Sequence, residues 1–82
     1  MLKLVRARRK AKLSGYAVAK EAKIDRSYYR YIELGKYVPS PDVATRIADA
    51  LNRLSGAQVI TPSEIVFENY QRREKARAVE AA

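Results

Sequence analysis

The sequence predicts an all-α fold, a compact bundle of five helices in a single domain of 82 residues. Two observations predict it. Apolar residues recur at helical spacing through most of the chain, and four polar residues or boxes suited to capping a helix N-terminus separate these periodic segments. A chain of this size buries roughly 60 % of its unfolded surface, so we expect modest stability.

The first two expected helices span residues 2–11 and 14–23. In the first, one inward face is formed by Leu4, Ala7, Arg8 and Ala11. Ser14 is a good N-cap for the second helix, because its hydroxyl can accept from the free amides there. Gly15 lies in the first turn and leaves these amides open to an anion such as a DNA phosphate.

The third expected helix, residues 26–34, is capped by Asp25 and followed by Gly35 as its C′ residue. Tyr29 and Ile32 define its inward side. The outward side carries Arg26, Ser27, Arg30, Tyr31 and Leu34, with Tyr28 at the margin. A short helix has little structural need for arginines and tyrosines outside its core face, so this side is the candidate binding surface.

The last two expected helices are preceded by strong start signals. Ser40-Pro41-Asp42 opens a helix over residues 41–54, and Thr61-Pro62-Ser63-Glu64 is a capping box that opens the fifth helix at residue 62. The fourth helix has an apolar stripe of Val43, Ile47, Ala50, Leu51 and Leu54. The inner residues of the fifth are expected to be Ile65, Val66 and Phe67.

The C-terminal segment divides the chain into a domain over residues 1–70 and a tail over residues 71–82. The tail has no Gly or Pro and can extend the fifth helix, but its few apolar residues are small. We therefore expect a frayed helix or disorder beyond about Arg73, unless a second chain covers Val66, Tyr70 and the tail alanines.

Composition excludes several classes of function. The chain has no cysteine and no histidine, so disulfides, the usual zinc sites and histidine general bases are missing. We expect no enzyme, no metal, no cofactor and no small-molecule ligand. The N-terminus lacks the apolar core of a signal peptide, and no run reaches the roughly 20 apolar residues of a membrane span. These features predict a soluble, cytoplasmic protein.

The charge points to a polyanionic partner. The net charge is +8, and residues 1–36 hold all of the excess, with eleven Lys and Arg against three acids. Five tyrosines, Tyr16, Tyr28, Tyr29, Tyr31 and Tyr37, are interleaved with these basic residues or follow them closely. Basicity concentrated in this way is typical of nucleic-acid binding. A basic face that only aids solubility is the plain alternative, and a membrane surface would require a larger apolar face.

The order of these elements resembles a known family. The residues that carry the resemblance are Leu4, Arg8, Leu13-Ser14, Val18-Ala19, Ile24, Ile32-Glu33, Gly35, Lys36, Pro39, Ala50-Leu51-Asn52 and Thr61-Pro62-Ser63-Glu64-Ile65. From residue 4 to about residue 67 the chain resembles the lambda-repressor-like (Cro/C1, XRE-type) helix-turn-helix DNA-binding domain, a five-helix bundle. The resemblance implies an ion pair between Arg8 and Glu33. The chain departs from the family pattern at Lys23, where glycine is common, and at Tyr29, where a compact β-branched residue is preferred.

The resemblance and the charge together predict sequence-specific binding of double-stranded DNA by a phage or bacterial repressor, with residues 26–34 in the major groove. The expected base-reading residues are Arg26, Ser27, Arg30 and Tyr31. The expected phosphate contacts are Gly15, Tyr16, Tyr28, Lys36, Tyr37, Arg6, Arg9 and Lys10, with Lys12 a further candidate. A palindromic operator and a homodimer formed through the fifth helix and tail are expected.

Two other functions fit the same features. The domain can be a protein-interaction module, such as an antitoxin that binds its toxin through the tail and also binds an operator. Alternatively, the basic half can be a non-specific architectural or single-strand binder that stacks bases on its tyrosines.

Overall fold

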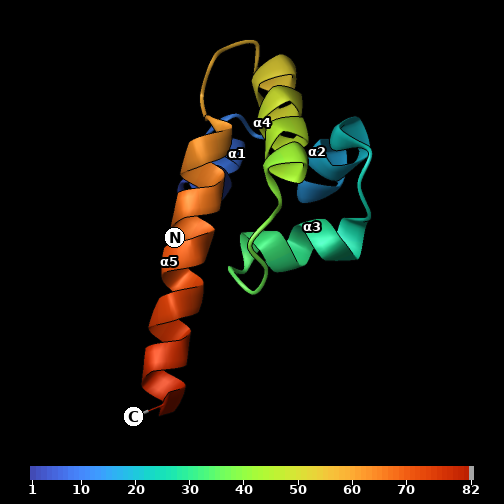
Figure 1. The fold of residues 1–82 in the computed structure, drawn as a ribbon. Coiled ribbons are helices and arrows are strands. Elements are labelled where there is room, and N and C mark those ends of the chain that lie inside the picture. Colours follow the sequence, from blue (N-terminus) through green and yellow to red (C-terminus); the bar gives the residue numbers. More distant parts are fainter. Residues whose placement is uncertain (82) are drawn as a thin grey trace.

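The computed structural model describes residues 1–81 and contains five α-helices, so the predicted all-α five-helix fold is confirmed. The helices are α1 (Lys3–Lys10), α2 (Gly15–Ala22), α3 (Arg26–Glu33), α4 (Pro41–Ser55) and α5 (Pro62–Ala81). Helix α4 packs against both α2 and α5. Helix α3 lies below α2 and α4 in the view of Figure 1. Among the described residues, no helix is long and apolar enough to cross a membrane.

The predicted caps are present. The side chains of Ser14, Asp25 and Ser40 accept from the backbone amide three residues later, at 3.0, 3.0 and 3.2 Å. The capping box of α5 is reciprocal, because Thr61 N donates to Glu64 Oε1 at 3.0 Å and Glu64 N donates to Thr61 Oγ1 at 3.3 Å. Hydrogen bonds from Lys3 and Thr61 lower the pKa of the Glu64 carboxyl.

The core lies where the helices meet. Its largest fully buried apolar side chains are Leu4, Val18, Tyr29, Ile32, Ile47, Leu51, Ile60 and Ile65. Two residues expected in the core are exposed instead, Leu54 by 38 % and Phe67 by 61 %. Leu54 belongs to the last turn of α4, which rises above the neighbouring helices in Figure 1. Phe67 cannot share a face with Ile65, because positions two apart on a helix are about 200° apart.

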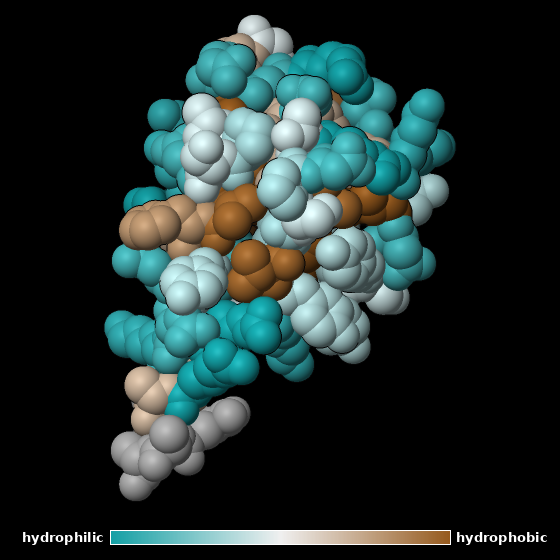
Figure 2. All heavy atoms as spheres, viewed as in Figure 1, coloured by the Kyte–Doolittle hydropathy of each residue, from teal (hydrophilic) through white to brown (hydrophobic). Residues whose placement is uncertain are grey.

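The C-terminal segment is helical, as the predicted extension of the fifth helix allows. Helix α5 is 20 residues long and continues to Ala81, well past Arg73. Its lower part stands free of the bundle, which gives the molecule extents of 43 × 21 × 21 Å (Figure 1). Most of the surface of this lower part is hydrophilic up to the grey atoms in Figure 2. Residue 82, the end of the expected tail, lies outside the described residues.

Candidate nucleic-acid interface

A polar network holds α3 against α1. Arg8 donates from Nε and Nη2 to the two carboxylate oxygens of Glu33, at 2.6 and 2.9 Å, and from Nη1 to the Leu13 carbonyl at 2.9 Å. The Tyr29 hydroxyl donates to Glu33 Oε2 at 2.5 Å. The charged side chains of the pair are 14 % and 13 % exposed, so water screens them little. The ion pair that the resemblance implied is therefore present as part of a three-residue network.

The network is reflected in the pKa of two members. Burial, followed by the adjacent charge of Glu33, raises the pKa of the Tyr29 hydroxyl above its ordinary range. The hydrogen bond to Glu33 raises the pKa of Arg8. Tyr29 therefore stays a neutral donor and Arg8 stays charged at neutral pH.

The ring of Tyr29 fits under the N-terminus of α2. Tyr29 is 2 % exposed, and a Cβ added at Gly15 would lie 3.4 Å from Tyr29 Cε2. The Tyr29 ring therefore packs close to Gly15, at a position where the resembling family has a smaller side chain. The expected departure at Tyr29 is accommodated by burying the ring and bonding the hydroxyl, without exposing either.

The turn between α2 and α3 contains the expected non-glycine residue in a left-handed conformation. Lys23 has φ 58° and ψ 46°, a conformation that costs on the order of 1 kcal/mol for such a residue. Arg46 of α4 donates to the carbonyls of Ala22 and Lys23 at the end of α2. This anchor, which the sequence did not predict, satisfies carbonyls that the helix itself leaves open.

The outward side of α3 faces solvent beside the start of α2. Arg26, Ser27 and Arg30 are exposed, and Tyr31 is 39 % exposed. A hollow of about 550 Å³ lies between the two helices and is lined in part by Tyr16, Arg26 and Arg30. The Arg26 guanidinium lies 5.3 Å from the centre of the Tyr16 ring, within the range of a cation–π contact.

The N-terminus of α2 presents open donors to the same hollow. The Ser14 hydroxyl accepts a hydrogen bond from the Ala17 amide, and the Ser14 carbonyl accepts one from the Val18 amide. Within residues 1–81 the amides of Gly15 and Tyr16 have no acceptor among the hydrogen bonds of the structure. Open amides at a helix N-terminus favour an anion.

A cluster of three tyrosines closes the other end of α3. Tyr37 packs against Tyr28 at 5.8 Å and against Tyr31 at 5.4 Å between ring centres, and the Lys36 ammonium lies 5.4 Å from the Tyr31 ring. The cluster fixes the segment after α3, so that Lys36 and Tyr37 stay on the surface next to the outward side of the helix.

The buried side chain of Asn69 in α5 holds the segment that follows α3. Asn69 was not predicted from the sequence as a site residue. It is 1 % exposed, and its Nδ2 donates to the carbonyls of Ile32 at 2.7 Å and Tyr37 at 2.9 Å. A signal was available in the sequence, because residue 69 lies one helical turn after Ile65 on the inward face. A buried amide at such a position indicates a structural hydrogen bond.

A comparison with protein families identifies this arrangement of helices. A helix-turn-helix family matches residues 4–57, which is more than half of the chain. The chain belongs to this family. Helix-turn-helix domains bind double-stranded DNA through the second helix of the motif, which is α3 here. No curated protein and no solved structure matches the chain significantly.

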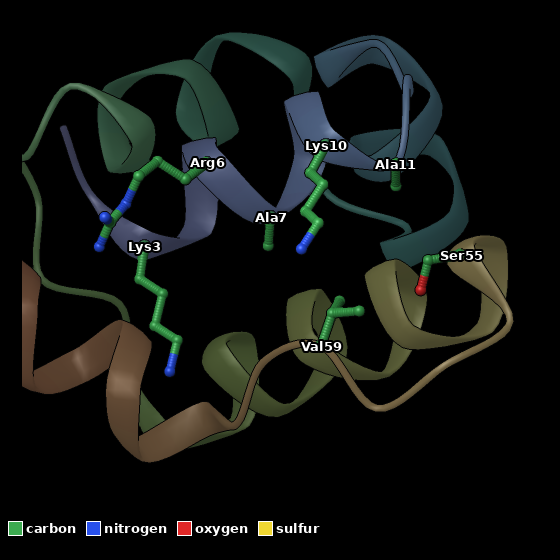
Figure 3. A pocket seen from close by; sticks show the side chains of 7 residues that line it. All are labelled: Lys3, Arg6, Ala7, Lys10, Ala11, Ser55 and Val59. Carbon is green, nitrogen blue, oxygen red and sulfur yellow. The ribbon is translucent and has the colours of Figure 1, made fainter.

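The helix-turn-helix lies on one side of α1, and the basic residues of α1 divide between its two sides. Arg9 lines a groove shared with Arg30 and Leu34. Arg6 and Lys10 are about 160° from Arg8 on the helical wheel. Together with Lys3 they line a separate hollow of about 650 Å³ whose floor includes Ala7 and Val59 (Figure 3). Of the three arginines and lysines expected at phosphates from α1, only Arg9 lies on the same side as α3.

Proposed function

We propose that the protein is a transcriptional repressor that binds a specific double-stranded DNA sequence with α3 in the major groove. The observation that supports this most directly is the outward side of α3, where Arg26 and Arg30 are exposed beside open amides of α2. Arg26 and Ser27, in the N-terminal turn, are placed to contact base edges first, followed by Arg30 and Tyr31. Each arginine can bind guanine O6 and N7 with two hydrogen bonds.

Phosphate contacts are assigned to groups around this surface. They are the Gly15 and Tyr16 amides, Arg9, Lys36, and the hydroxyls of Tyr28 and Tyr37. Arg6 and Lys10 are left out, because they lie on the far side of α1. These contacts supply affinity and orientation, whereas the base edges supply specificity. The DNA-binding domain is assigned to residues 1–70.

Two substitutions separate these roles. We expect Arg26→Ala to relax the preference at one base pair by about 1–3 kcal/mol, because a bidentate base contact is lost. Lys36→Ala should weaken all sequences about equally and reduce the salt slope by about 1. The measurement is selection of bound duplexes from a random pool, followed by binding to the selected site at several salt concentrations. Identical sequence profiles for the two variants would contradict the assignment.

A second copy of the chain is the proposed partner of α5. The outer side of this helix exposes Phe67 by 61 % and Tyr70 by 54 %, beside an apolar hollow of about 490 Å³ that also includes Val66, Pro41 and Pro62. Exposed aromatic side chains of this size are typical of protein contacts. One domain reads few base pairs, so repressors of this type pair on palindromic sites.

The dimer is tested by sedimentation equilibrium. The wild-type protein is expected to associate in a concentration-dependent manner, and Phe67→Ser with Tyr70→Ser is expected to remain monomeric, because the apolar contact area is lost. Leu54→Ser, which replaces an exposed apolar residue of α4, is the matched control and should associate like the wild type. A wild-type monomer at every concentration would overturn the dimer without affecting DNA binding by the single domain.

A further inference from the structure

Helix α5 continues past the end of α3. Two contacts show where α5 passes the C-terminal end of α3. Asn69 bonds to the Ile32 carbonyl, and the Arg72 side chain lies directly over Gly35, where an added Cβ would collide with it. Residues 73–81 follow, and nine residues of helix are ~13 Å long. Figure 1 shows this extension reaching well beyond α3.

The extension emerges on the side of α3 that faces solvent. The first part of α5 packs against α1 and α4, and the inward side of α3, with Tyr29 and Ile32, faces the same core. A straight helix that leaves this core at the end of α3 must continue on the opposite side of α3. That is the side exposing Arg26 and Arg30, so the extension flanks the proposed DNA surface.

The extension carries a small net positive charge. Residues 73–81 hold three basic and two acidic residues, while residues 37–70 have a net charge of −2. On the side away from the bundle, Glu74 pairs with Arg77 at 3.3 Å. Arg72, Arg73 and Lys75 lie within about 80° of the direction of Ile65, the inward side. In the part of the chain that the structure describes, none of these three has an acidic partner.

The inward side of the extension is exposed, and a phosphate backbone can approach it closely. Ala76 lies between Arg73 and Lys75 on this side, and all three residues are exposed. A methyl group flanked by two long cationic side chains allows a phosphate backbone to approach the helix.

We propose that the extension of α5 is a second DNA-binding element, whose Arg73 and Lys75 contact the phosphate backbone beside the groove occupied by α3. The inference rests on the proposed function, since it needs the outward side of α3 to face the duplex. A second copy of the extension is a poor occupant of this surface, because its cations would face like charges. The family match ends before α5, so this element is additional to the helix-turn-helix.

The test compares two variants of the full chain that lose the same charge. Arg73→Gln with Lys75→Gln removes two cations of the extension and leaves Arg72, which packs on Gly35, in place. Arg6→Gln with Lys10→Gln removes two cations from the far side of α1 and is the control. Binding to a duplex of about 30 base pairs selected from a random pool is measured at several salt concentrations, and circular dichroism checks the fold.

We expect the extension variant to lower the salt slope by about 1.8 and to weaken binding up to ~60-fold at about 0.1 M salt, the counterion-release contribution of two phosphates. Its sequence preference should be unchanged. The control should keep the wild-type slope. Equal slopes for the extension variant and the wild type would overturn the proposal, as would equal losses in the two variants. Absence of duplex binding by the wild-type protein would instead refute the proposed function itself.

Discussion

Replacing Glu33 with alanine is expected to lower the free energy of unfolding by about 3–5 kcal/mol. The change removes the acceptor of two Arg8 hydrogen bonds and of the Tyr29 hydroxyl, and leaves a guanidinium unpaired at a site where its side chain is 14 % exposed. In a domain of this size each 1 kcal/mol corresponds to about 4–8 °C, so the melting temperature should fall by more than ~12 °C. Thermal and urea unfolding followed by circular dichroism measure both quantities.

Two further variants separate two costs of Glu33→Ala, which are the unpaired charge of Arg8 and the loss of the Arg8–Glu33 interaction itself. Glu33→Gln keeps one carbonyl acceptor and should cost less than alanine. The triple change Arg8→Met, Tyr29→Phe and Glu33→Leu removes every polar member of the network together. It should recover most of the loss, because apolar replacement of a buried pair is often neutral. A Glu33→Ala loss below about 1 kcal/mol would show that the pair behaves like an exposed one.

The helix starts could be predicted because they depend on local chemistry. Ser14, Asp25, Ser40 and the box at Thr61 each act within four residues of the chain, and the structure contains every one of these caps. The inward residues of α3 followed in the same way from helical periodicity. The exposed side of α3 could be predicted for this reason, since it is the side opposite Tyr29 and Ile32.

The features that could not be predicted depend on where neighbouring helices end. Leu54 has the right spacing for the apolar stripe of α4, but the bundle does not reach its turn. The sequence left the tail either helical or disordered because it has little to bury, and α5 continues to Ala81. Its side chains there are strong helix formers, and intrinsic propensity does not require burial.

Side chains that bond to the backbone of another helix were also missed. Arg46 lies 23 residues from the Lys23 carbonyl that it contacts, and no spacing rule connects such positions. The same holds for Asn69, which is 37 residues from Ile32. Arg46 bonds to the end of α2 and Asn69 bonds to the last turn of α3, so both ends of the segment that contains α3 are held by side chains distant in the sequence.

Replacing Asn69 with aspartate is expected to cost about 3 kcal/mol or more at pH 7, and this second large effect should depend on pH. Asn69 Nδ2 donates to two carbonyls, and an ionised carboxylate would instead place a negative charge against both at a site that is 1 % exposed. The buried carboxyl should therefore have a pKa above its unfolded value of about 3.9.

A group whose pKa is raised in the folded state favours folding fully only below its unfolded pKa. The stability deficit of Asn69→Asp should be smallest below about pH 4 and should grow by up to about 1.4 kcal/mol per pH unit as the pH rises toward the folded pKa. Urea unfolding of variant and wild type at pH 3.5 to 8 measures the difference. A deficit that is constant over this range would contradict a buried, ionising carboxyl at residue 69.

Asn69→Leu is the matched control, because it has a similar shape and no titrating group. It should cost about 1–3 kcal/mol at every pH, since the Tyr37 carbonyl loses its donor while the Ile32 carbonyl keeps the Gly35 amide at 3.0 Å. The substitution should also weaken DNA binding, because the hydrogen bond from Asn69 to the Tyr37 carbonyl holds the segment that carries Lys36. At a temperature where the variant is fully folded, its affinity for the selected duplex should therefore fall while the base preference set by Arg26 remains.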